Sequence, residues 1–576
     1  MRRLTEAAAT SRTAALSYVS STSTSSASAA SCLSASSASC SFFSSYSLSP
    51  LRSRVTLGRT ETPLTRRKQA IGTSLTRHHI AHSIALLFLL VFALPASAHV
   101  GSPDVFLDAD AGPYRLFVTV RVPQVIPGIA QIEIRSASAD VRQIKIAPMQ
   151  LTGPGSQYPP TPDVAQQSRT DPQFFTGSLW LMELGSLQVR VDVDGAKGPG
   201  HLSVPVPAVA QTTLPMQKPL GTLLFGLMLL LAGAIVSISA AAVREGDLPA
   251  GAAASEAKAR RASIATVVAA IVVGGILFIG GEWWKSDATQ FARRVYAPPQ
   301  LDAVLQPDGQ LILHEKPIHF AAGNPRRPED VINFNNLILD HGHLMHFFML
   351  RMPQMDSFWH LHPSVSGPET FADNLPPIPP GHYDLFADVV LSSGFPVTMV
   401  GQIDVPAITG KPLTGDDSGV AAPPLSQDAK DSTVYNFPGG GKMIWQRSPG
   451  PLKANAPLEF QFHVEDKDGK PARDLEPYMG MSAHAEIIRS DASVFAHVHP
   501  AGSVSMAALD IAQAQMPGAA QQSQQDAMAS MPGMSATVEP DISFPYGFPK
   551  PGQYRVFVQI KQTGQIETAV FNATVD

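Results

Sequence analysis

The sequence predicts a mostly β protein with three β-sandwich domains, two transmembrane α-helices and a disordered N-terminal extension. Three observations carry this prediction: short segments that alternate apolar and polar residues, two long uncharged apolar stretches, and 50 prolines and 43 glycines among 576 residues. Such a proline and glycine content is typical of short strands joined by turns and disfavours a helical bundle. The length allows roughly three to four domains of ordinary size.

Composition narrows the partners and the ligand chemistry. Only 15% of the residues are charged and the net charge is −5, which disfavours nucleic acid as a partner because a nucleic-acid binder needs a strongly basic face. The two cysteines, Cys32 and Cys40, both lie in the N-terminal extension. If that extension is removed, any metal ligand of the borderline kind comes from His and any soft one from Met.

The N-terminus has the features of an export signal. Residues 1–83 are low-complexity sequence rich in Ser, Ala and Thr, which cannot build a core. Residues 84–98 follow a basic flank with a short apolar run and an A-x-A ending, the pattern of a secretory signal peptide cleaved after Ala98. A buried core helix is the alternative. The unusual length before the signal suggests a true start downstream of Met1, and cleavage makes His99 the new N-terminus.

Two later stretches, 220–243 and 262–281, each have the length and apolarity of a membrane-spanning helix. The loop between them, 244–261, carries Arg244, Lys258, Arg260 and Arg261. Positive residues mark the cytoplasmic side, so we expect this loop inside and both flanking regions outside. This places an integral protein in a lipid bilayer, the bacterial inner membrane, with most of the chain periplasmic.

The exported regions are read as three domains, 99–217, 300–410 and 432–576, each built from alternating segments bounded by Pro and Gly. A linker is expected at about 410–430 and a flexible insertion at 510–540. In the two later domains the expected strands are 310–314, 336–339, 346–351, 357–362, 383–390, 397–405, 458–464, 484–489, 494–499, 554–561 and 568–575.

A histidine pattern occurs twice and indicates a duplicated domain. The first copy reads H-x13-H-x-H-P and the second H-x12-H-x-H-P, and a Pro-Gly turn with an aromatic strand follows each. The six histidines are His346, His360 and His362 in the first copy, and His484, His497 and His499 in the second.

The spacing has a geometric meaning. Residues i and i+2 of a strand share a face, and a hairpin turn after the first histidine places it opposite the last, where Cβ atoms lie ~5 Å apart. Three imidazoles then converge in each copy, a set that suits copper or zinc. Asp340, His341 and His343 are further candidate ligands of the first copy. The alternative is a structural role, in which the histidines tie each hairpin to a neighbouring loop.

Methionines near the first cluster are a weaker indication of copper, because thioethers select Cu(I). Core filling is the preferred reading for the set near the cluster. These methionines are Met345, Met349, Met352 and Met355, with Met516, Met528, Met531 and Met534 in the insertion.

The first exported domain holds two histidines, His99 and His201. A terminal His offers an amine and an imidazole to one ion, and together with His201 it would form a copper-brace type of site. This reading requires cleavage at Ala98.

The segments DHGHLMHFFMLRMPQMDSFWHLHP with PPIPPGHYDLFADVV, and DLEPYMGMSAHAEIIRSDASVFAHVHP with KPGQYRVFVQI, resemble YtkA-like domains of exported bacterial proteins. The resemblance covers roughly residues 300–405 and 433–576, and a weaker similarity extends to CopC-like and FixH-like copper-handling modules. It implies immunoglobulin-like sandwiches, and its implications for function are slight.

The leading functional expectation is a membrane-anchored metal-binding protein that buffers, senses or delivers copper, with zinc as the alternative ion and metal-handling envelope proteins as candidate partners. The competing hypothesis is a non-metal docking module of the envelope. The chain has no G-x-S-x-G, H-E-x-x-H or dinucleotide fingerprint. We therefore expect a protein without enzymatic activity.

Overall fold

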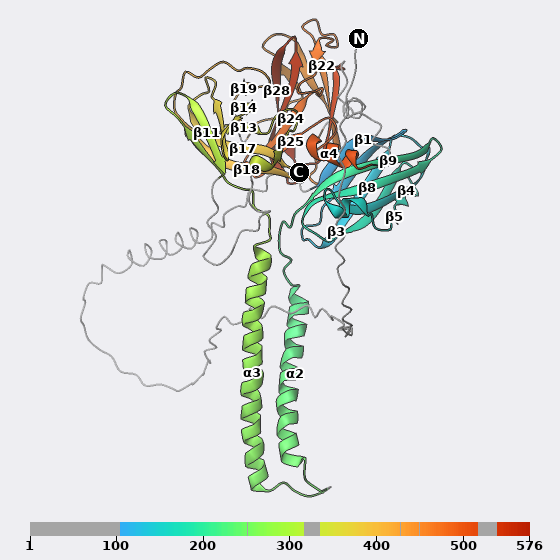
Figure 1. Cartoon of the computed structure of the whole chain (residues 1–576), viewed down its shortest axis with the longest axis vertical. Coiled ribbons are helices and arrows are strands. Elements are labelled where there is room, and N and C mark those ends of the chain that lie inside the picture. Colours follow the sequence, from blue (N-terminus) through green and yellow to red (C-terminus); the bar gives the residue numbers. More distant parts are fainter. Residues whose placement is uncertain (1–103, 250, 316–333, 427, 449, 517–537) are drawn as a thin grey trace, which may run out of the picture. The chain divides into compact units, whose positions relative to one another are not determined.

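The computed structural model describes residues 104–249, 251–315, 334–426, 428–448, 450–516 and 538–576 (Figure 1). The described chain divides into a helical hairpin, residues 215–287, and a β-rich body, residues 104–214 and 288–576. The predicted extension 1–83, the signal region 84–98 and His99 lie outside the described residues. The prediction of a mostly β protein is confirmed.

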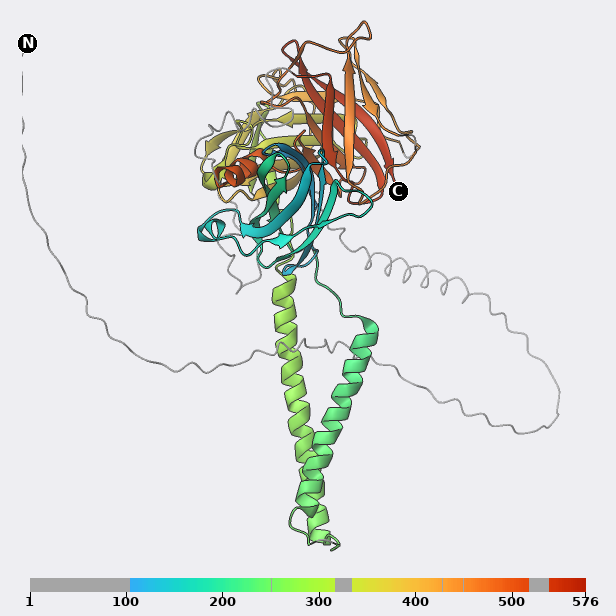
Figure 2. The same cartoon turned by 90° about the vertical axis from the view of Figure 1, so that its right-hand side faces the viewer.

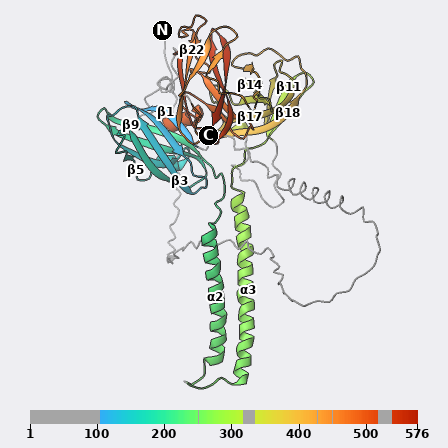
Figure 3. The ribbon, with the colours of Figure 1, turned by 180° about the vertical axis from the view of Figure 1, so that it is seen from behind.

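The hairpin consists of α2 (Lys218–Glu245) and α3 (Glu256–Ala292), which run in opposite directions and are joined by a short loop (Figures 1 and 3). Both helices are long and apolar enough to cross a membrane. Their apolar side chains are largely exposed, as expected for surfaces that face lipid. α3 extends beyond the predicted 262–281 at both ends, because the polar flanks continue the helix.

The N-terminal β unit, residues 104–214, contains two antiparallel sheets that enclose a common core. Its main strands are β1 (Val105–Ala111), β2 (Tyr114–Arg121), β3 (Gly128–Ser136), β4 (Val141–Gln150), β5 (Asp163–Val164), β6 (Gln166–Gln167), β7 (Phe174–Leu181), β8 (Gly185–Gly195) and β9 (Gly198–Ala208). The sheet orders are β1-β2-β3-β7-β6 and β5-β4-β8-β9. Leu116, Val118 and Val120 illustrate the alternate inward-pointing residues that fill the core.

The middle β unit, residues 300–421, holds the first histidine pattern. Its strands are β10 (Leu301–Leu305), β11 (Gln310–Glu315), β12 (Leu337–Ile338), β13 (His346–Arg351), β14 (Ser357–Leu361), β15 (Ser364–Gly367), β16 (Thr370–Asn374), β17 (Gly381–Leu391), β18 (Pro396–Val405) and β19 (Ser418–Ala421). One sheet has the order β10-β11-β16-β15, and the other β12-β17-β13-β14-β19 with β18 paired to β17.

The C-terminal β unit, residues 434–576, is drawn in orange to red in Figure 2 and holds the second histidine pattern. Its elements are β20 (Val434–Asn436), β21 (Lys442–Gln446), β22 (Leu458–Glu465), β23 (Leu475–Glu476), β24 (His484–Arg489), β25 (Phe495–Val498), α4 (Met506–Ala514), β26 (Asp541–Tyr546), β27 (Gly552–Gln562) and β28 (Gln565–Val575). The order β23-β27-β24-β25, with β28 on β27, repeats β12-β17-β13-β14 with β18 on β17. The shared topology supports the predicted duplication.

Two expectations about connecting segments need correction. The predicted linker 410–430 contains β19, which pairs with β14 and so belongs to the sheet of the middle unit. The predicted flexible insertion 510–540 begins inside α4, whose residues Met506, Leu509 and Ala512 are buried. Residues 517–537 of the insertion lie outside the described residues.

The middle and C-terminal units pack through two equivalent aromatic pairs. Phe358 stacks on Phe557 with ring centroids 4.1 Å apart, and Phe386 stacks on Phe495 at 4.2 Å. Phe358 and Phe495 each stand two residues before the H-x-H of their copy, and Phe386 and Phe557 occupy the same place in β17 and β27. The contact is therefore related by a local two-fold operation, as in the isologous interface of a homodimer.

The N-terminal unit contacts the C-terminal unit at the loop after β25. The peptide nitrogen of Asp108 donates to the carbonyl of Ala501, and Ser503 exchanges hydrogen bonds with Phe106. Gly502 is required here, because a Cβ would lie 2.0 Å from the Phe106 carbonyl oxygen. The same contact brings α4 against the N-terminal unit, and Leu509 of α4 belongs to the hydrophobic core of that unit.

Candidate metal centre

Two hairpins carry the repeated histidine pattern. Continued by one position, the register of β13 and β14 places His346 across from His362. The same step in β24 and β25 places His484 across from His499. The strand pairing predicted from the spacing is therefore confirmed in both copies.

The first histidine group is His346, His360 and His362. One nitrogen of each lies within 4.8 Å of a nitrogen of both others, a geometry able to hold one metal ion. His346 and His360 are buried, and the side chain of His362 is 4% exposed. The structure brings together the three residues that the sequence analysis assigned to one site.

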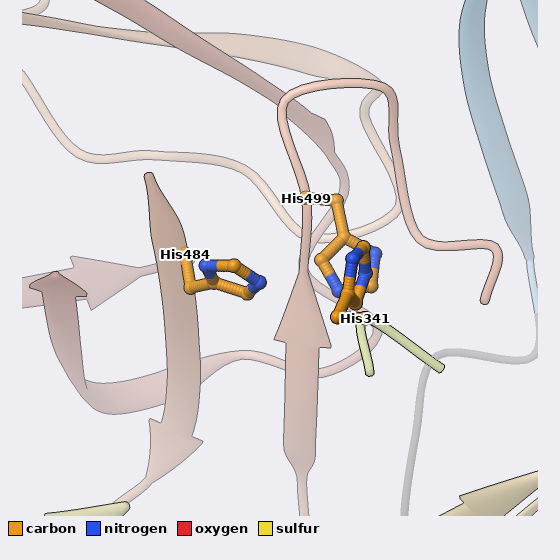
Figure 4. A group of neighbouring side chains, drawn as sticks. All are labelled: His341, His484 and His499. Carbon is orange, nitrogen blue, oxygen red and sulfur yellow. The ribbon is translucent and has the colours of Figure 1, made fainter. Parts of the chain in front are cut away.

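The second group has a different membership from the one predicted. It consists of His341, His484 and His499, again with nitrogens within 4.8 Å of one another (Figure 4). His341 was expected to join the ligands of its own copy, and His497 was expected in this group. The chain reverses at His341 and Gly342, both with positive φ, and this turn carries the imidazole across to the other copy. Its ring centroid lies 4.7 Å from that of His499.

His497 lies between the two groups. Its ring centroid is 5.3 Å from that of His346 and 4.6 Å from that of His499. His343 lies at the edge: its ring stacks on His362 at 3.9 Å and its side chain is 28% exposed. The two copies thus share one continuous cluster of imidazoles.

Hydrogen bonds fix which nitrogen of the first group carries the proton. His346 Nε2 lies 3.1 Å from the Asp340 carbonyl, His360 Nδ1 lies 2.8 Å from Gln559 Oε1, and His362 Nδ1 lies 3.0 Å from Asp417 Oδ1. Each of these nitrogens donates to an oxygen. The other nitrogen of each ring keeps its lone pair and points into the group, which is the arrangement of metal-bound histidines with their supporting partners.

Among the described residues, the second group has more unpaired ring nitrogens than the first. His499 Nδ1 donates to the Val504 carbonyl at 3.2 Å, and His341 has a backbone hydrogen bond to Met479. The Nε2 atoms of both residues, and both nitrogens of His484, are buried without a hydrogen-bond partner in the described part of the chain. A buried polar atom left unpaired costs ~1–3 kcal/mol, so an ion that accepts these lone pairs would remove several such penalties.

Burial keeps these imidazoles neutral. It lowers the pKa of His341 and of His499 to about 3, and the charge that neighbouring histidines would carry lowers them further. Burial likewise lowers the pKa of His360, His484 and His497 well below the usual range. Neutral imidazole is the form that binds metal, so at neutral pH these side chains are in the form that a metal ion would require.

Glu486 places an unpaired carboxyl group beside this cluster. It is fully buried, neither oxygen has a hydrogen-bond partner within the described residues, and Oε1 lies 3.8 Å from His360 Nδ1. Burial raises its pKa well above the usual range, and nearby Asp388 adds to the effect. A bound cation would reverse this balance and stabilise the carboxylate.

The local two-fold relation extends to the partners of the central histidines. His360 meets Gln559 of the other copy, and the equivalent His497 lies 3.5 Å from Asp388, which occupies the place of Gln559 in β17. The two copies also differ in that His341 and His343 of the first correspond to Met479 and Met481 of the second.

The remaining candidates lie outside the cluster. His201, in β9, bonds to Asp192 at 2.6 Å on an exposed part of the strand and belongs to neither histidine group. His99 is not among the described residues, so the copper-brace reading stays a prediction. Met345, Met349 and Met355 are buried in hydrophobic clusters, which agrees with their reading as core residues.

Comparisons with known proteins leave the function open. Residues 440–576 match a family described as a domain of unknown function, DUF8832. No curated protein matches the sequence.

Among solved structures, Salmonella alpha-2-macroglobulin aligns at a TM-score of 0.18 and 9% identity over 81% of this chain and 24% of its own length. The ICAM-5 D1–D4 fragment aligns at 0.14 and 7% over 80% and 77%, and latent PorU from Porphyromonas gingivalis at 0.13 and 8% over 82% and 34%. This chain thus spans about a quarter of the length of the macroglobulin. Similarity at this level carries no argument.

Four polar residues of the centre were not identified from the sequence: Asp388, Asp417, Glu486 and Gln559. The only sequence signal for Glu486 is its position two residues after His484, on the same face of a strand. Asp388 and Gln559 lie in the strands after the Pro-Gly turns, and their role depends on how the two copies face each other.

Proposed function

We propose that this chain is a membrane-anchored extracytoplasmic metalloprotein whose two β copies, of immunoglobulin-like type, hold a centre of two adjacent metal ions, with copper the preferred metal. One ion would be bound by His346, His360 and His362, and the other by His341, His484 and His499. His497 is close enough to both groups to complete either one. The single observation that carries the proposal is the convergence of buried imidazole nitrogens in two groups, in which nitrogens of His341, His362, His484 and His499 have no hydrogen-bond partner within the described residues.

Copper is favoured by charge. The ligands are neutral imidazoles in a buried site, where each additional positive charge is costly. Two Cu(I) ions carry two positive charges in total, of which the Glu486 carboxylate would offset one. Imidazole also suits Zn(II), which remains the alternative, although among divalent ions binding strength generally favours Cu(II) over Zn(II).

Burial also bears on the role. Ligands enclosed by two domains exchange an ion slowly, which favours a resident centre over rapid buffering or delivery. The membrane hairpin would hold the centre outside the cytoplasm, since the loop between α2 and α3 carries the positive residues.

The test is the metal content of the full chain, purified in detergent after expression with copper or zinc, measured by mass spectrometry and followed by titration with a chelator. We expect about two copper ions per chain, with an electron paramagnetic resonance signal from nitrogen ligands after oxidation. Fewer than one ion per chain with either metal, or binding unchanged by His360→Leu and His484→Leu, would overturn the proposal and favour the docking module.

A further inference from the structure

A cavity of about 190 Å³ lies against one side of the histidine cluster. Its polar wall includes His346, His497 and His499, and its apolar wall includes Val206, Phe395 and Val397. All three β units contribute to it, so it forms only when they are packed together.

The ring nitrogens at this wall are available for coordination. The Nε2 atoms of His497 and His499 are buried and have no hydrogen-bond partner among the described residues. His346 contributes a ligand of the first group and His499 one of the second, so the cavity adjoins both proposed ions.

The histidine cluster has two sides that the local two-fold relation makes equivalent, and the cavity lies on only one of them. On the cavity side the cluster is lined by Asp340 and Asp388. Their equivalents on the other side are Tyr478 and Gln559. The Tyr478 ring packs against His484 at 5.0 Å, and Gln559 bonds to His360 and Ser418. The larger side chains thus fill the space that the smaller acidic ones leave open.

We propose that this cavity holds a small, uncharged, mainly apolar molecule, bound at an open coordination position of the metal centre. The inference rests on the proposed function, because it requires the metal. The volume sets the size: a dry cavity of ~150 Å³ accommodates benzene, whereas drug-sized ligands need ~300 Å³ or more. An apolar wall opposite the metal ligands favours a molecule that has one atom able to donate a lone pair to the metal ion and is apolar elsewhere. Metal sites that keep a position open bind and activate molecules, in contrast to closed structural sites.

The experiment uses the full chain in detergent, loaded with Cu(I) and assayed for metal first. Carbon monoxide, methyl isocyanide and naphthyl isocyanide are then added, and the infrared stretch of the bound ligand is recorded. We expect the first two to bind and naphthyl isocyanide to be excluded. Val397→Phe, which fills the cavity, should weaken carbon monoxide binding at least tenfold, while Val304→Phe, at an exposed position of the same unit, should leave it unchanged.

Phe395→Ala provides an independent arm if Val397→Phe fails to fold. It enlarges the cavity and should admit naphthyl isocyanide. The inference is wrong, while the proposed function stands, if the protein holds copper but binds no carbon monoxide. It is also wrong if Phe395→Ala binds carbon monoxide, methyl isocyanide and naphthyl isocyanide each with the same affinity as the parent. If the protein holds no metal, the proposed function fails first.

Discussion

His346 Nδ1 lies 3.1 Å from His360 Nε2, and the hydrogen-bond network leaves both atoms with a lone pair. His346 donates from Nε2 to a carbonyl, and His360 donates from Nδ1 to Gln559. The Gln559 amide orientation follows from its other neighbour, since its Nε2 donates to Ser418 and Ser418 in turn donates to Tyr478. Two nitrogens bound to one ion at ~2.0 Å are roughly 2.8–3.3 Å apart for angles from about 90° to tetrahedral. The observed separation fits a shared ion.

The two groups should lose metal separately. His360→Leu should remove the ion of the first group and His484→Leu that of the second, each reducing the metal content of the full chain by one ion. The metal-free proteins should differ in stability. His484→Leu removes two unpartnered nitrogens and should be neutral or stabilising by about 1 kcal/mol, whereas His360→Leu leaves Gln559 without its donor and should cost about 1–3 kcal/mol. Metal analysis and urea unfolding measure both effects. Equal loss of both ions in either variant would contradict two separable sites.

The stability of the metal-free protein should report the burial of His499 through its pH dependence. The folded pKa of about 3 lies below the unfolded value of ~6.5, so the unfolded chain binds more protons between these values. The stability that neutral His499 provides is fully present above the unfolded pKa and is lost as the pH falls toward the folded one. The free energy of unfolding of His499→Leu should therefore rise relative to that of the parent by ~1.4 kcal/mol for each pH unit below pH ~6.5. Above that pH of ~6.5 the difference between the two proteins should be constant. Parallel urea-unfolding curves from pH 7 to 4 would refute the assignment.

Glu486→Gln tests the role of the buried carboxyl group. Without metal the substitution should leave stability unchanged or slightly raised, because burial already disfavours the charged form. With copper it should weaken binding roughly 10- to 100-fold, since a supporting charge is lost. Competition with a chelator gives the affinity. Glu459→Gln, on the exposed face of β22, is the matched control and should bind as the parent does.

Gly502→Ala should separate the N-terminal unit from the loop that carries His499. Gly502 and Gly564 both have positive φ, but only at Gly502 would a Cβ meet a carbonyl, at 2.0 Å. Gly564→Ala should cost about 1 kcal/mol from the backbone alone. Gly502→Ala should cost about 1–3 kcal/mol more from overpacking, and should speed metal loss because His499 and Gly502 are joined by two backbone hydrogen bonds. Thermal unfolding measures the stability, and the rate of metal transfer to a chelator measures the metal loss. Similar values for Gly502→Ala and Gly564→Ala would contradict the prediction.

The proposed orientation of the hairpin can be tested with single cysteines in a chain whose Cys32 and Cys40 are replaced by serine. In intact spheroplasts, a membrane-impermeant maleimide should label Ser364→Cys. It should label Ser255→Cys only after the spheroplasts are lysed. Both positions are exposed in the structure. Labelling of Ser255→Cys from outside would reverse the orientation.

Local pattern was sufficient for the eleven strands expected in the two later units and for the first histidine group, but not for β10, β15, β16, β21 and β26, which were not expected. The expected segments 346–351 and 484–489 coincide with β13 and β24, each buried at five of its six positions. The H-x-H spacing on the partner strands determines which histidines share a face. The spacing also gave the pairing of His346 with His362, since a hairpin allows few registers.

The second group could not be obtained in this way. His341 reaches residues more than 140 positions away, and this contact depends on how the sheets of the middle and C-terminal units pack. Phe358, Phe386 and their counterparts determine that packing, but nothing local in the sequence distinguishes an interface phenylalanine from a core one. Ser418–Ala421 is short and follows Gly and Asp residues, a pattern typical of a linker, and it forms a strand by pairing with the edge of β14.

The two-fold relation between the copies has a further consequence. If the two copies were separate identical chains, a centre shared across such an interface would form only at protein concentrations above the dissociation constant of the dimer. Any substitution would then occur in both halves of the centre. Joined in one polypeptide, the halves meet at an effective concentration that dilution cannot lower. Each half is also free to diverge, so His341 and His343 can occur on one side and Glu486 on the other. The two proposed ion positions would therefore differ chemically, because only the first would have a histidine, His360, beside Glu486.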